Sequence, residues 1–119
     1  MTTHVVLFTP RPDLSDAQRS ELAATLASSL DEIPSVRRYQ VGRRIRLGTA
    51  YDREAALDFA FLVVIDFDDQ NGLVAYLRHP RHEALGQLFY STSQLAAAAD
   101  FETVSGDIAS TLAAWAGST

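Results

Sequence analysis

The chain has 119 residues, a formal net charge of −5 and neither cysteine nor lysine. This length predicts a single domain over 1–119, with a core at 3–104 and a helical extension at 105–119. The missing residue types exclude disulfides, thiolate nucleophiles, cysteine metal ligands and lysine Schiff bases. The modest acidic charge, without any acidic or basic block, argues against nucleic acid or an anionic membrane as a partner.

Residues 4–10 (HVVLFTP) predict a strand that stops at Pro10, because the segment is short and rich in β-branched residues. Alternation along a strand places His4, Val6 and Phe8 on one face. The N-terminus lacks a basic leader, and no apolar run approaches the ~20 residues of a membrane span. These features predict a cytoplasmic protein.

A helix is expected after this strand. Ser15 can cap its first turn, and Gln18 occupies the reciprocal position of a capping box. Apolar side chains then recur at helical spacing until Pro34 ends the pattern. These side chains are Leu22, Leu26, Leu30 and Ile33.

Two further strands are expected, at 37–47 and 57–69, with a turn or excursion (GTAYDREA) between them. The first alternates Tyr39, Val41, Ile45 and Leu47 with arginines and a glutamine, which predicts one solvated face. The second is apolar on both faces, with Phe59, Phe61, Val63, Ile65 and Phe67 on one and Ala60, Leu62 and Val64 on the other. A strand of this kind needs two covers. We expect helices on one side and a second sheet, from another subunit, on the other.

The remaining elements complete a recognisable order. Residues 70–78 and 80–90 predict two helices, and 96–104 lies where a last strand is needed. Residues 107–116 predict an amphipathic helix packed through Ile108, Leu112 and Trp115. The order β-α-β-β-α-β indicates an α+β, ferredoxin-like fold with a four-stranded antiparallel sheet and helices on one face.

The segment HPRH at 79–82 carries the main chemical signal. Proline disfavours helical geometry in the residue before it and suits the first position of a new helix. We therefore expect His79 at a junction and His82 in the first turn of the helix that begins at Pro80. The positive end of the helix dipole disfavours a charged imidazole there. A neutral His82 is able to act as a general base.

Structural roles are alternatives for each of these residues. His79 can serve as a cap, Tyr76 as a core residue with its hydroxyl at the rim, and His4 as a core histidine whose hydrogen bonds are satisfied. The three histidines could also bind zinc. However, a spacing of i, i+3 across a proline is not a standard ligand pattern, so we predict no metal site.

The stretches HVVLF, IPSVRRYQVG, DFAFLVVIDFDD and above all YLRHPRH resemble the stress-responsive dimeric α/β-barrel (Dabb) family over residues 3–104. The resemblance implies a homodimer that closes a barrel sheet to sheet. One branch of the family contains the plant olivetolic acid cyclase, which acts by intramolecular aldol condensation without a cofactor. Its catalytic tyrosine and histidine correspond to Tyr76 and His82, and its pocket histidine corresponds to His4.

The favoured hypothesis is a cofactor-independent cyclase for a small polyketide-like carbonyl compound. His82 would remove an α-proton, Tyr76 would hydrogen-bond the enolate oxygen, and His4, His79 and Phe8 would bind or orient the substrate. One alternative is a non-catalytic stress-responsive protein that binds a small ligand or forms a stable oligomer. A second alternative, from fold analogy, is a cofactor-free monooxygenase.

Overall fold

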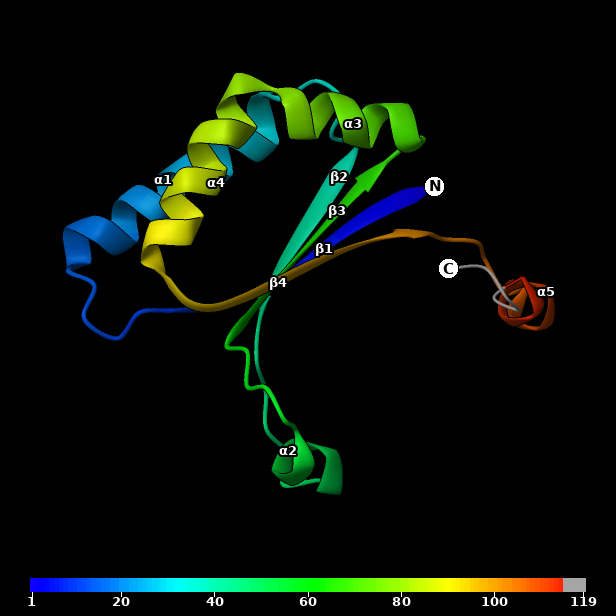
Figure 1. Cartoon of the computed structure of the whole chain (residues 1–119), viewed down its shortest axis with the longest axis horizontal. Coiled ribbons are helices and arrows are strands. Elements are labelled where there is room, and N and C mark those ends of the chain that lie inside the picture. The colour runs from blue at the N-terminus through cyan, green and yellow to red at the C-terminus, as the bar shows by residue number, and fades with distance from the viewer. Residues whose placement is uncertain (115–119) are drawn as a thin grey trace.

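The computed structural model describes residues 1–114, which form one sheet with the helices at 16–32, 70–78 and 80–92 on one side (Figure 1). The sheet is antiparallel and has the order β2-β3-β1-β4. The elements in chain order are β1 (Thr2–Pro10), α1 (Asp16–Glu32), β2 (Arg38–Arg43), α2 (Ala50–Glu54), β3 (Phe61–Phe67), α3 (Gln70–Arg78), α4 (Pro80–Thr92), β4 (Ser93–Glu102) and α5 (Ile108–Ala113). The ferredoxin-like fold and the C-terminal helix predicted from the sequence are confirmed.

The core lies between the sheet and the helices α1, α3 and α4. On β3 the side chains of Val63, Ile65 and Phe67, which the alternation predicted to share one face, are fully buried on this side. Across the core, Tyr76 of α3 packs its ring against Phe67, with ring centroids 5.3 Å apart. Burial of this continuous apolar layer is the main force that holds the helices on the sheet.

The start of α1 follows the capping box predicted from the sequence. The Ser15 hydroxyl accepts from the Gln18 backbone N–H at 3.1 Å, and the Gln18 side chain accepts from the Ser15 N–H at 2.8 Å. The helix ends at Glu32, so Ile33 is its C-cap and not its last helical residue. Ile33 is nevertheless buried in the core.

The opposite face of the sheet is apolar and has no helix over it within residues 1–114 (Figure 1). The strand register places these side chains in rows, since Val5 pairs with Val64 and with Ala99. Leu7 in the same way pairs with Leu62 and with Ala97.

None of the helices within residues 1–114 has the length and apolar character of a membrane-spanning segment.

Two sequence predictions need correction. The second strand ends at Arg43, and residues 44–60 leave the sheet as a projection that contains α2, so Ile45 and Leu47 lie outside the strand and are exposed. The Arg44 backbone N–H donates to the Ala60 carbonyl oxygen across the base of the projection. This backbone hydrogen bond joins the two chain segments where the projection begins. The predicted packing of α5 is also wrong in the single chain, because Ile108 and Leu112 are 72% and 70% exposed. Trp115 lies outside the described residues.

Candidate functional site

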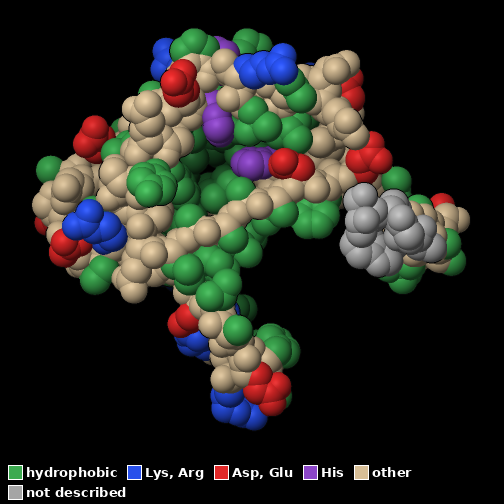
Figure 2. Space-filling view, viewed as in Figure 1, with side chains coloured by type: hydrophobic (Ala, Val, Ile, Leu, Met, Phe, Trp, Pro, Cys, Tyr) green, Lys and Arg blue, Asp and Glu red, His purple; other side chains and the backbone are tan. Residues whose placement is uncertain are grey.

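A cavity of about 400 Å³ opens between the helices and the sheet, and histidine side chains gather at its opening (Figure 2). Its residues come from β1, β3 and β4 below and from α1, α3 and α4 above. The lining is His4, Val6, Leu26, Val63, Ile65, Tyr76, Leu77, His82, Leu85, Gly86, Phe89, Tyr90, Ala96 and Ala98. The cavity therefore combines a long apolar wall with a small polar end, which is typical of small-molecule sites.

The break between α3 and α4 sets the direction of the polar end. His79 has an extended backbone (φ −69°, ψ 138°) and is both the C-cap of α3 and the N-cap of α4. Its Nδ1 accepts a hydrogen bond from the Arg81 backbone N–H at 3.1 Å. Pro80 is the first residue of α4. The predicted junction is confirmed, and the ring of His79 is a helix cap that does not line the cavity.

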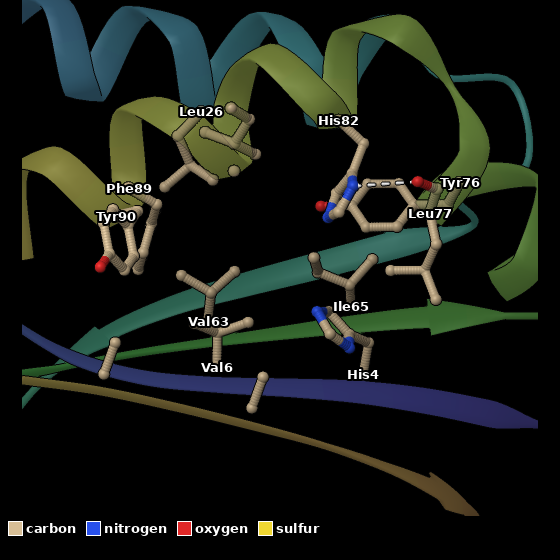
Figure 3. Close-up of a pocket in the computed structure, with 14 residues that line it drawn as sticks. His4, Val6, Leu26, Val63, Ile65, Tyr76, Leu77, His82, Phe89 and Tyr90 are labelled. Carbon is tan, nitrogen blue, oxygen red and sulfur yellow. Dashed lines mark hydrogen bonds between the residues drawn. The ribbon is translucent and has the colours of Figure 1, made fainter.

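Tyr76 and His82 meet on the cavity side of this break (Figure 3). Their ring centroids are 4.7 Å apart, and Tyr76 is only 2% exposed. The Nδ1 of His82 lies 3.2 Å from the Leu77 carbonyl oxygen, an atom that can only accept. Nδ1 therefore carries the proton, and in the neutral ring Nε2 is left as an acceptor.

Burial shifts the pKa values of His82 and Tyr76 in the directions that favour their neutral forms. It lowers the pKa of His82 below its ordinary value of 6.5, with a smaller contribution from His4, while the hydrogen bond to Leu77 opposes the change. Burial also raises the pKa of Tyr76 to about 12. Near neutral pH the site thus presents an uncharged imidazole that can accept a proton and a phenol that can donate a hydrogen bond.

His4 reaches the same end of the cavity from β1. Its Nδ1 lies 2.5 Å from Oδ1 of Asp100, the residue opposite it on β4. Since a carboxylate only accepts, Nδ1 donates, and Figure 3 shows the other ring nitrogen turned toward the helices. The ring centroids of His4 and Tyr76 are 6.0 Å apart. The structure thus brings His4, Tyr76 and His82 together.

Asp100 is a site residue that the sequence analysis missed. The signal was available, because an antiparallel pairing of the first and last strands would place an acidic residue near His4. The register needed to choose Asp100 over Glu102 comes only from the structure. The apolar wall formed by Phe89, Ala96 and Ala98 was also missed.

Phe8 does not line the cavity. It is buried in an aromatic cluster, with its ring centroid 4.6 Å from that of Phe89 and 5.4 Å from that of Phe61. It therefore supports the wall from behind.

Within residues 1–114, no three metal-ligating side chains come together as a metal site.

The comparisons with known proteins agree with this architecture. A family model described as the stress responsive A/B barrel domain (Dabb) matches residues 2–103. An Arabidopsis thaliana protein has a TM-score of 0.72 at 16% identity, covering 88% of this chain and 97% of its own. A dimeric ferredoxin-like protein of unknown function from Thermobifida fusca has a TM-score of 0.65 at 26% identity, covering 86% and 90%. A hydroxynitrile lyase from Passiflora edulis has a TM-score of 0.72 at 12% identity, covering 87% and 94%. No curated protein sequence matches the chain.

The lowered pKa of His82 predicts a pH-dependent stability. Below about pH 6.5 the unfolded state binds a proton that the folded state resists, so stability falls as the pH drops through that value toward the folded-state pKa. The melting temperature of the wild type should fall more between pH 7.5 and 5.5 than that of His82→Gln. His79→Asn, which keeps a capping acceptor, should follow the wild type. Equal falls in wild type and His82→Gln would contradict the assignment.

Proposed function

The chain belongs to the stress-responsive A/B barrel (Dabb) family, and we propose that it is a cofactor-independent enzyme that closes a ring in a small polyketide-like carbonyl compound by an aldol-type reaction. The observation that carries the proposal is the pair of complementary groups at the polar end of the cavity. His82 is a neutral proton acceptor, and Tyr76 is a protonated hydrogen-bond donor. The centroids of the two rings are 4.7 Å apart.

The reaction follows from the roles these groups can take. Nε2 of His82 removes a proton from the carbon between two carbonyl groups, and the Tyr76 hydroxyl donates a hydrogen bond to the enolate oxygen. The enolate carbon attacks a more distant carbonyl carbon in the same molecule, which forms the new carbon–carbon bond of a six-membered ring and leaves an alkoxide. The proton held by His82 returns to that oxygen. Loss of water then gives the unsaturated ring.

His4 and Asp100 complete the polar end. The Asp100 carboxylate fixes the ring of His4 through Nδ1, at 2.5 Å, so that Nε2 is available to a bound molecule. We assign His4 to the carbonyl that the enolate carbon attacks, where it can hold the oxygen that becomes negative.

The apolar wall sets the shape of the substrate. Val6, Val63, Phe89 and Ala98 leave room for an alkyl or aryl group beyond the reacting carbonyls, and a cavity of about 400 Å³ is within the range of small-molecule sites. We therefore propose a linear polyketone with an apolar tail as the substrate class.

A non-catalytic ligand-binding protein is the second candidate. The cavity wall is almost wholly apolar, so the cavity would hold a small apolar molecule whether or not His82 transfers a proton. The structural neighbours include a hydroxynitrile lyase and proteins of unknown function, so the likeness in fold does not decide between the two candidates.

We also propose that the functional unit is a homodimer joined through the open face of the sheet. The rows formed by Val5, Leu7, Leu62 and Val64 would expose a contiguous apolar surface in a monomer, which soluble monomers seldom do. The Thermobifida fusca relative, at 26% identity, is dimeric.

The enzyme proposal predicts specific losses of activity. With a 3,5,7-triketo thioester that bears an alkyl chain, His82→Ala should lower kcat/KM by ~10²–10⁴-fold because the general base is lost. Tyr76→Phe should lower it by ~10²–10³-fold, because the enolate loses a preorganised donor. Absorbance of the aromatic product measures the rate.

Tyr39→Phe is the matched control, because that phenol bonds Asp31 outside the cavity and its loss should leave the rate unchanged. Full activity in His82→Ala would contradict the proposal. A wild-type protein that is stabilised against heat by the compound but never converts it would support the ligand-binding candidate instead.

The dimer proposal predicts the effect of a charge on the open face. Val64→Glu should give a monomeric or aggregating protein, because the carboxylate would be buried without a partner at the interface. Ser20→Glu, on the exposed side of α1, should keep the wild-type mass. Light scattering at micromolar concentration measures both. A folded, monomeric wild type would refute the dimer.

A further inference from the structure

The segment between β2 and β3, residues 44–60, forms an arm that points away from the sheet (Figure 1). No side chain of its helix α2 is buried. The arm exposes large apolar side chains, with Leu47 at 72% and Tyr51 at 71% exposure, and Ile45 and Leu57 are also exposed. A surface of this kind, outside the core, marks an interaction site.

Polar contacts within the arm hold it in a defined shape. Arg44 lies 3.5 Å from carboxylate oxygens of both Asp52 and Asp58, and Arg46 also bonds Asp58. The Leu47 backbone N–H donates to Asp52 at 2.9 Å. The apolar side chains are therefore presented by a braced scaffold, although nothing within residues 1–114 covers them. This arrangement favours a preformed contact surface over a flexible connection.

The strand directions indicate where the arm would lie in a dimer. The edge strands are β2 and β4, and each has one side without a strand partner within residues 1–114. β2 runs parallel to β1, since both are antiparallel to β3, and it is therefore antiparallel to β4. A two-fold axis along the strands, between two facing sheets, brings β2 of one subunit beside β4 of the other and keeps them antiparallel. The end of β2 at Arg43, where the arm begins, then lies beside the start of β4 at Ser93.

The mouth of the cavity lies at the start of β4, where the partner's arm would begin. Tyr90, 90% exposed near the end of α4, and Ala96, near the start of β4, both line the cavity. Figure 2 shows the hollow opening along β4, between that strand and the helices. The apolar end of the cavity is thus open to solvent in the single chain, at the edge where a second copy would place its arm.

We propose that the arm of a second copy of this chain covers the apolar end of the cavity and contributes side chains to the substrate site. Leu47 and Tyr51 of the partner subunit lie against Tyr90 and close the space that receives the substrate tail. This inference rests on the homodimer proposed above. In this arrangement His4, Tyr76 and His82 of a site come from one subunit, and the arm comes from the other. The substrate site is therefore complete only in the dimer, where the arm excludes water from the apolar end.

The test uses the natural lack of cysteine, because engineered thiols are then the only ones in the protein. The double variant Leu47→Cys/Tyr90→Cys is treated with a short bis-maleimide and separated on a denaturing gel. A covalent dimer is expected, with a cross-linked peptide that joins positions 47 and 90. The two single variants control for links between identical positions. Ile108→Cys/Tyr90→Cys is the matched control, because α5 follows the opposite end of β4 and should give no dimer.

Three outcomes decide between the proposals. A 47–90 link between subunits supports the placement of the arm. A protein that is dimeric by light scattering but links 108–90, or forms no link, overturns the arm while leaving the dimer. A monomeric protein overturns the arm and the dimer together, while the roles of His82 and Tyr76 are still judged by the activity of their own variants.

Discussion

The break between α3 and α4 is the constraint on which the site depends. On one straight helix, residues six positions apart point in different directions, because a turn takes 3.6 residues. The extended backbone at His79 and the proline after it start a second helix along a new axis. Tyr76 and His82 consequently face each other across the break, and the Leu77 carbonyl fixes the tautomer of His82. A local rule of proline geometry therefore sets both the position and the protonation of the proposed base.

The two faces of the sheet differ in what covers them. One face carries the helices, the core and the cavity, so the side chain of Tyr76, a proposed catalytic group, is held in place by core packing. The other face is apolar but uncovered within residues 1–114, and the arm at 44–60 projects beyond the sheet with exposed apolar side chains. Both features have the same physical explanation, since a second copy of the chain would remove these surfaces from water. The dimer and the completed substrate site are then consequences of one association.

Local signals in the sequence predicted much of this structure. Alternation predicted which side chains of β3 share a face, the Ser15–Gln18 pair predicted the start of α1, and Pro80 predicted the junction at His79. What failed depended on contacts between distant residues. The alternation of Ile45 and Leu47 resembles a strand, but the pairing with β3 ends at Arg43. The pairing of His4 with Asp100 needs a register across 96 positions, and the position of Phe8 behind Phe89 depends on three-dimensional packing.

The central claim is that His82 is neutral near physiological pH with its proton on Nδ1, so that Nε2 is free to accept the proton of a substrate. Nitrogen-15 NMR of the histidine rings, assigned with the His82→Gln variant, measures the tautomer and the pKa directly. The account predicts the Nδ1–H tautomer for His82 and a pKa below 6.5. An Nε2–H tautomer, or a pKa above 6.5, would contradict it.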